Sequence, residues 1–256
     1  NVVKRAEAWG HRAIAITDHG VMYGVGDFYR ACKAEGIKPI IGCEVYVAPR
    51  TRFDKQHEFD SEARHLVLLC ENEEGYRNLS YLVSMAHVEG FYIKPRIDLD
   101  LLREHSKGLI ALSACLAGEI PRRLRNGDYN GAKEYALTLS EIFGPEHFYL
   151  ELQDHGIRDQ AIVNKGILRL HETGLPLVVT NDAHYLRKED AYAHDVLLCI
   201  QTGKTVDDEN RMRYEPQRFY LRSTEEMAAL FPDYPEAIEN TGKIAERCNL
   251  EFTFGK

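Results

Sequence analysis

The sequence contains no apolar run long enough to cross a bilayer, which takes about 18 or more consecutive apolar residues. We therefore expect no membrane-spanning helix and no membrane partner. The chain also opens without a methionine and without the basic and apolar regions of a signal peptide, so we expect its first residue to be a cut edge.

Closely spaced cysteine pairs of the C-x-x-C type are absent as well. The six cysteines are scattered at wide intervals along 256 residues. This spacing predicts reduced thiols and a cytoplasmic setting, because disulfide frameworks belong to oxidising compartments and mostly to smaller chains. Any functional cysteine is then expected to act through the chemistry of its thiol and not through a disulfide bond.

Three common nucleotide and hydrolase motifs are missing: G-x-G-x-x-G after a strand, G-x-x-x-x-G-K-[ST] and G-x-S-x-G. No motif in the sequence therefore supports a dinucleotide-binding fold, a P-loop enzyme or a serine hydrolase. The composition, 44% hydrophobic and 28% charged, predicts a packed core. A net charge of −8 predicts repulsion of a phosphate backbone over most of the surface, so any duplex affinity must be local or lie in other domains.

Short apolar runs alternate with amphipathic stretches, which predicts an α/β fold of parallel strands and crossover helices, either a barrel or a doubly wound sheet. The predicted strands are 13–17, 39–47, 65–70, 109–112, 148–152 and 177–180. The predicted helices are 2–9, 26–34, 75–87, 129–142, 160–172 and 189–200.

The pattern changes after residue 203, so we expect a barrel over 1–203 and an appendage over 204–256. The appendage contains two predicted helices, 223–231 and 236–248. Ser223, followed three residues later by Glu226, is the signature of a helix start. The polar segment 50–64 is expected to be a surface loop.

Polar residues follow the apolar strand that ends near Ile16. Functional groups in parallel α/β folds gather beyond the carboxyl ends of the strands, so Asp18 and His19 are well placed. Neighbours on an extended segment point to opposite faces, and only one of the two is expected to be a metal ligand. The alternative is that Asp18 caps the next turn and His19 is an ordinary loop residue.

A second pair, Asp182 and His184, follows the strand that ends near Thr180. Because the two residues are two positions apart, they share a face and can meet one metal or two adjacent metals. The alternative is a solvated turn in which Asp182 caps the helix beginning near Lys188.

Glu44 lies inside an otherwise apolar strand, on the face shared by Ile40, Gly42 and Tyr46. A buried carboxylate costs several kcal/mol unless it is paired or binds a cation, so a metal is an economical explanation. The alternative is an edge strand or bulge with Glu44 in solvent.

Cys115 follows another predicted strand, where a thiolate suits zinc, although a buried free thiol is the commoner fate of a lone cysteine. His155 follows the strand 148–152 and is a further candidate. His65 begins its strand and is not selected by its position. Together these residue types indicate a multinuclear hydrolytic metal centre.

Five segments resemble the PHP (polymerase and histidinol phosphatase) domain family. They are ITDHG (16–20), GCEVYV (42–47), GLIALSACLAGEIP (108–121), ELQDHG (151–156) and TNDAHYL (180–186). The phrase GFYIKPRIDLDLL (90–102) further resembles the branch of the family found in bacterial replicative DNA polymerases. The resemblance runs over the whole chain.

The resemblance implies a distorted (β/α)7 barrel that holds up to three divalent metals. Glu44 resembles the bridging carboxylate, and His65 and Cys115 complete one metal site. Asp182 resembles a ligand of the neighbouring metal, and His19 and His184 match ligands of the third. The family's opening His-x-His motif on the first strand is expected to precede residue 1.

Asp18 and His155 are then expected to orient ligands or hold a bridging water. One thiolate among histidines and carboxylates favours zinc, with manganese or magnesium as alternatives.

The implied activity is that of a metal-dependent phosphoesterase, a 3′–5′ exonuclease, within a replicative DNA polymerase. Its partners are then DNA, reached through the rest of the polymerase, and other polymerase subunits. Two alternatives stay open: a scaffold that braces the polymerase and docks a proofreading subunit, and a free phosphatase of small phosphate esters.

Overall fold

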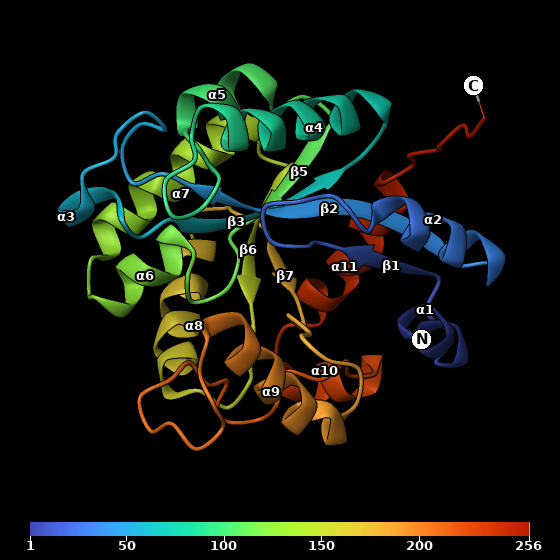
Figure 1. The fold of residues 1–256 in the computed structure, drawn as a ribbon. Helices are drawn as coiled ribbons and strands as arrows, with labels where there is room; N and C mark the ends of the chain where they lie inside the picture. The colour runs from blue at the N-terminus through green and yellow to red at the C-terminus, as the bar shows by residue number, and fades with distance from the viewer. Residues whose placement is uncertain (256) are drawn as a thin grey trace.

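The computed structural model describes residues 1–255, in which helices flank a curled sheet (Figure 1). The strands are β1 (Ala13–Ile16), β2 (Lys38–Val47), β3 (Arg64–Cys70), β4 (Arg96–Ile97), β5 (Leu109–Leu112), β6 (Phe148–Leu152) and β7 (Leu177–Val179). The helices are α1 (Val2–Ala8), α2 (Val25–Ala34), α3 (His57–Asp60), α4 (Glu73–Val88), α5 (Leu99–His105), α6 (Glu119–Arg125), α7 (Tyr129–Phe143), α8 (Arg158–His171), η1 (Lys188–Asp190), α9 (Ala191–Thr202), α10 (Thr224–Leu230) and α11 (Pro235–Arg247).

The predicted α/β class and distorted barrel are confirmed. The strand order is β1-β2-β3-β5-β6-β7, with β4 paired to β2, and no pairing joins β1 to β7 within residues 1–255. The six predicted strands and the predicted helices all form, with ends within two residues of expectation. The sequence patterns missed α3, β4, α5 and α6, which are all seven residues or shorter and give a weak periodic signal.

The expectation of an all-parallel sheet was wrong at one strand. β1–β2, β5–β6 and β6–β7 are parallel, but β3 runs antiparallel to both β2 and β5. A parallel neighbour needs a crossover connection, usually a helix, whereas an antiparallel one does not. The connection between β2 and β3 contains only the four-residue α3, so the chain turns back alongside β2.

Alternation along the strands separates two faces of the sheet. One face, with Ile41, Cys43 and Val45 of β2, packs in the main core against the flanking helices. On the other face Ile40 belongs to a smaller cluster with Ile244 and Cys248, at and just beyond the end of α11. α11 therefore covers one end of the inner face, and the opposite end is left for the polar side chains that follow the strands.

The C-terminal segment packs onto this framework. Ser223 caps α10 and Glu226 completes a capping box, as predicted. Met227, Phe231 and Ala237 are buried in the main core. The boundary between 203 and 204 stays a prediction. Among the described residues, no helix combines the length and apolar character that a membrane span requires.

The segment 50–64 is tied down more firmly than a surface loop. Asp60 is fully buried and accepts hydrogen bonds from Arg50 at 2.5 and 3.0 Å. Arg96, also fully buried, donates to the backbone oxygens of Gly90, Asp60, Arg52 and Asp54. One guanidinium thus joins this segment to β4.

We expect Arg96→Met to lower the free energy of unfolding by about 3 kcal/mol, because buried carbonyl oxygens lose their donors. Arg103→Met is the matched control. Arg103 is exposed and pairs only with Asp100 on the same helix, so its loss should cost about 0.5 kcal/mol or less. Urea unfolding of both variants measures the difference, and equal midpoints would contradict the structural role of Arg96.

Candidate metal centre

Three candidate ligands come together from three consecutive strands. His19 follows β1, Glu44 lies in β2 and His65 lies near the start of β3. The His65 Nδ1 atom is 2.5 Å from Glu44 Oε1, and the His19 Nδ1 atom is 3.6 Å from Glu44 Oε2. One donor atom from each residue lies within 4.8 Å of the others, close enough for these side chains to take part in one metal centre.

The direction of β3 explains why His65 takes part. Because β3 is antiparallel, its amino end lies beside the carboxyl ends of its neighbours, with His65 opposite Tyr46 of β2. The rule that sites follow carboxyl ends assumed a parallel strand and therefore did not select His65. The resemblance to the PHP family did select His65.

Cys115 joins this group from the loop after β5. Its Sγ atom is 3.7 Å from His65 Nδ1 and 3.9 Å from Glu44 Oε1. The residue before it, Ala114, has a left-handed backbone with φ +64°, which non-glycine residues rarely adopt. Such strained positions cluster at functional sites.

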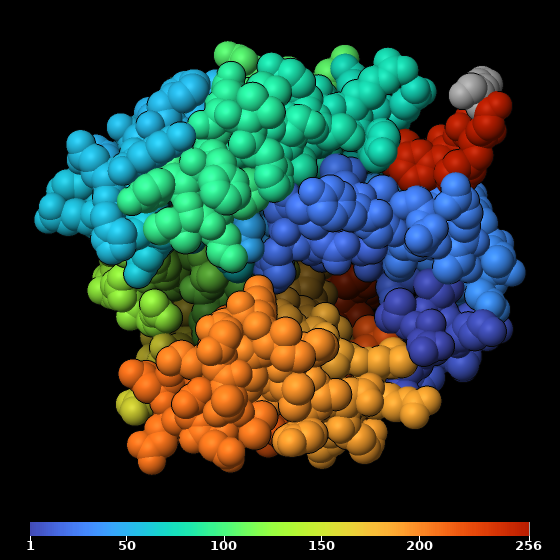
Figure 2. Space-filling view, viewed as in Figure 1, coloured from blue at the N-terminus to red at the C-terminus, as the bar shows by residue number. Residues whose placement is uncertain are grey.

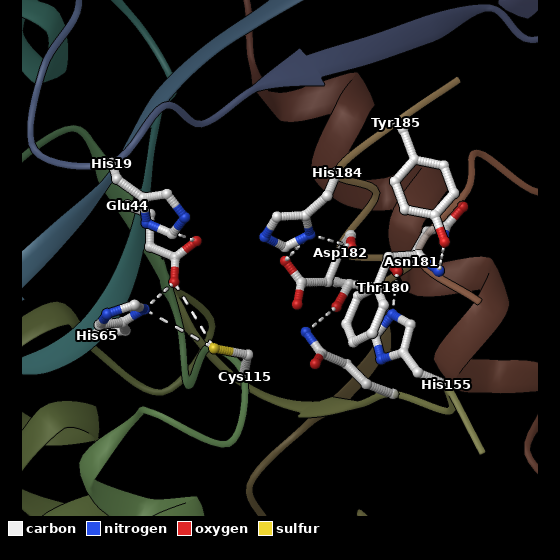
Figure 3. Close-up of polar contacts among 12 residues, drawn as sticks. His19, Glu44, His65, Cys115, His155, Thr180, Asn181, Asp182, His184 and Tyr185 are labelled. Atoms are coloured by element: carbon white, nitrogen blue, oxygen red, sulfur yellow. Dashed lines mark hydrogen bonds and ion pairs between the residues drawn. The ribbon is translucent and has the colours of Figure 1, made fainter. Parts of the chain in front are cut away.

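Asp182 and His184 face this group from the loop after β7 (Figure 3). The His184 and His19 rings are 6.2 Å apart between centroids, and His184 Nδ1 is 3.8 Å from Asp182 Oδ1. Asp182 is a second non-glycine residue with a positive φ, +48°. Figure 2 shows the molecule hollowed between the blue N-terminal segment and the orange segment that includes α9.

Asp18 and His155, the two residues predicted to orient ligands, make different hydrogen bonds. The Asp18 backbone oxygen accepts from the Glu44 amide at 3.0 Å, so Asp18 fixes the strand that carries Glu44. His155 is fully buried, with Nε2 hydrogen-bonded to the Asn181 backbone oxygen and Nδ1 to Gln160, both at 2.7 Å. His155 therefore contacts the loop of Asp182 and not the ligand group itself.

The charges at the centre are strongly coupled. Burial opposes ionisation of Glu44, but the hydrogen bond and charge of His65, helped by His19 and His184, outweigh burial and lower the pKa of Glu44. The pKa of His19 is lowered by burial despite the Glu44 carboxylate. The lowered pKa of His19 favours its neutral imidazole, the form in which histidine binds metals.

The remaining acidic groups resist ionisation when no cation is near. Burial, with a contribution from Glu44, raises the pKa of Asp182 to about 6 and the pKa of the Cys115 thiol well above its usual value. A divalent cation reverses this by its own charge, since a coordinating thiol is deprotonated outright. Imidazole, thiolate and carboxylate together form a donor set that zinc accepts. The residues present thus fit a bound metal.

A second buried carboxylate escaped the sequence patterns. Glu151 of β6 is 5% exposed, and burial raises its pKa to about 7. The argument that selected Glu44, an acidic residue inside an apolar strand, applies equally to Glu151 in 148–152 and was the available signal. Tyr214, whose ring is 4.6 Å from the His184 ring between centroids, carried no comparable signal.

The buried His155 ring makes a testable contribution to stability. Burial lowers its pKa from 6.5 to about 4, so between these pH values the unfolded chain binds a proton that the folded chain does not. Acidification from pH 6.5 to 4 should therefore cost about 3 kcal/mol of unfolding free energy through this ring.

His155→Gln should lack this dependence, whereas His57→Gln, at an exposed site, should retain it. Urea unfolding of the three proteins at pH 6.5, 5 and 4 measures the dependence. Parallel pH profiles for wild type and His155→Gln would refute the assignment.

The curled α/β sheet, with its histidine, cysteine and carboxylate cluster beyond the strands, agrees with comparison of the sequence to known proteins. The family model of the PHP domain matches residues 1–155, and the chain belongs to this family.

The similar curated proteins include DNA polymerase III subunit alpha of three bacteria. The Treponema pallidum protein is 48% identical over 97% of this chain, the Borreliella burgdorferi protein 47% over 99%, and the Thermus aquaticus protein 44% over 95%. The aligned region is 22%, 22% and 20% of those proteins. The chain thus spans about a fifth of the length of these relatives.

Proposed function

We propose that this chain is the PHP domain of a DNA polymerase III alpha subunit and forms a metal-dependent phosphoesterase centre acting as a 3′–5′ exonuclease. The observation that carries the proposal is that His19, His65 and Cys115 surround the buried Glu44 carboxylate. Asp182 and His184 face this group (Figure 3). Sequence identity of 42–48% with alpha subunits supports the polymerase assignment.

In this proposal Glu44, His65 and Cys115 hold one metal, with Asp182 on its neighbour and His19 and His184 on a third. A divalent metal supplies Lewis-acid stabilisation of phosphoryl oxygens and an activated water. His65, hydrogen-bonded to Glu44, sets the direction in which that carboxylate points.

Two further features serve the substrate in this proposal. The Lys94 ammonium is 5.4 Å from the Tyr46 ring centroid, and Lys94 is exposed, so it offers a positive charge to an incoming phosphate beside His19. Asp18 and His155 act through the backbone, by holding the segments that carry Glu44 and Asp182.

The donor set favours zinc, with manganese or magnesium as alternatives.

The wider assignments belong to the same proposal. Residues 1–203 form the barrel and 204–256 an appendage leading toward the rest of the polymerase. The partners are DNA, bound mainly through other domains because this one carries a net charge of −8, and replicative polymerase subunits in the cytoplasm.

One observation favours a scaffold role as the second candidate. Tyr192, Leu197 and Ile200 of α9 are 67%, 61% and 72% exposed, which is a large apolar area for a single helix. A scaffold needs such contact surface and no working metal centre.

Glu44→Ala in the full alpha subunit should remove bound metal and lower nucleotide release from a primer 3′ end by about a hundredfold, since even weaker perturbations around a metal cost 10–100-fold. Glu104→Ala, at an exposed position on α5, is the matched control and should change neither. Elemental analysis and a primer degradation assay, with no other subunit present, measure both quantities.

Equal metal content in wild type and Glu44→Ala would remove Glu44 from the centre. Metal bound in the wild type without any nucleotide release would support the scaffold in place of the exonuclease.

A further inference from the structure

Glu151 is a buried carboxylate without a cationic partner. It is 5% exposed, and within the described residues no lysine, arginine or histidine lies within ion-pair distance of it. An uncompensated buried carboxyl group costs several kcal/mol, so its hydrogen bonds must supply what a cation does not.

Both carboxylate oxygens of Glu151 are used, and they serve different loops. Oε2 accepts from the Ala114 backbone amide, in the loop that follows β5. Oε1 accepts from the Thr180 hydroxyl at 2.6 Å and from Gln153 Nε2 at 3.4 Å. The Glu151 amide donates to Ser113 Oγ at 2.8 Å, which adds a second link to the β5 loop.

The two loops held by Glu151 are those that carry candidate ligands. Ala114 immediately precedes Cys115, and Thr180 lies two residues before Asp182. Ala114 keeps its left-handed backbone while its amide points at Glu151 Oε2. A hydrogen bond to a buried acceptor can hold such a strained residue in place.

The chemistry of the side chain matters as well as its size. The ionised carboxylate, which predominates above its raised pKa of about 7, accepts on both oxygens, whereas a glutamine amide accepts on one side and donates on the other. In glutamine the nitrogen would face either the Ala114 amide or the Thr180 hydroxyl. With the nitrogen toward Ala114, that amide loses its acceptor. With the nitrogen toward Thr180, two amide nitrogens oppose each other, because Gln153 Nε2 already donates to Thr180 Oγ and to Glu151 Oε1, and the Thr180 hydroxyl hydrogen loses its acceptor.

We propose that Glu151 is a positioning residue of the candidate metal centre, which sets the Cys115 loop relative to the Asp182 loop by accepting hydrogen bonds from both. The inference rests on the proposed metal site but adds a residue that is not itself a ligand. It links the group around Glu44 to the group that faces it.

The first test is metal affinity in the full alpha subunit. At pH 8, where Glu151 is ionised, Glu151→Gln should weaken zinc binding by about tenfold, measured by competition with a chromogenic chelator. Glu71→Gln is the matched control. Glu71 is also a largely buried carboxylate, bonded to Arg247 and His147 just beyond the carboxyl end of β3, away from the centre. The Glu71→Gln variant should keep the wild-type zinc affinity even if its free energy of unfolding falls. This result would separate a positioning role from a general loss of stability.

The second test needs no metal. Cys115 is partly buried, and the other five cysteines are buried. In metal-free protein, Glu151→Gln should speed alkylation of Cys115, read by mass spectrometry of the peptide that carries it, because its loop is no longer held. Glu71→Gln should label at the wild-type rate.

These two measurements distinguish the possible failures. Wild-type zinc affinity in Glu151→Gln, or wild-type labelling of Cys115 in that variant, would overturn the positioning role. If the wild-type protein binds no zinc, the proposed metal centre fails, and the labelling rates alone decide whether Glu151 holds the loop.

Discussion

The Glu44 carboxylate sits in the middle of a buried strand, and the rest of the centre is arranged around the need to compensate its charge. A strand without a polar partner could not keep this residue ionised. His65 meets it at 2.5 Å and His19 at 3.6 Å, and their combined effect lowers the pKa of the carboxyl group despite its burial. The same environment makes Cys115 and Asp182 reluctant to ionise until a cation is present. An anionic carboxylate beside imidazoles, with a thiol and a second carboxyl group whose ionisation a cation would favour, is a donor set suited to a divalent metal.

The two ends of the inner sheet face carry different kinds of side chain. Around one end, residues at and just beyond the carboxyl end of α11 pack on apolar positions of the strands. At the other end the polar groups collect, because the loops after β1, β5 and β7 and the start of β3 all lie on the same edge. Two of these loops pass through left-handed residues, Ala114 and Asp182, that place their side chains where a relaxed backbone would not. Glu151 lies between these two loops and accepts a hydrogen bond from each, which is the basis of the positioning role proposed for it.

The chain belongs to the PHP family and is similar to about a fifth of the length of DNA polymerase III alpha subunits. A domain with a net charge of −8 is poorly suited to hold a duplex by itself. The proposed nuclease function therefore requires that neighbouring domains deliver the substrate. The exposed apolar side chains of α9 offer a surface for such neighbours.

The sequence by itself determined the longer helices and strands and most residue types of the site. Alternating apolar runs located the strands, and the placement of Glu44, Cys115, Asp182 and His184 in or after those runs predicted a cluster, since carboxyl ends of strands share an edge. What only the tertiary structure decided was strand direction and the partners of buried groups. Periodicity is the same for parallel and antiparallel strands, so His65 was passed over by position until the reversed β3 brought it to Glu44. Nor does local pattern report which distant amide or hydroxyl a buried carboxylate meets, and the contacts of Glu151 with two loops exist only once the chain is folded.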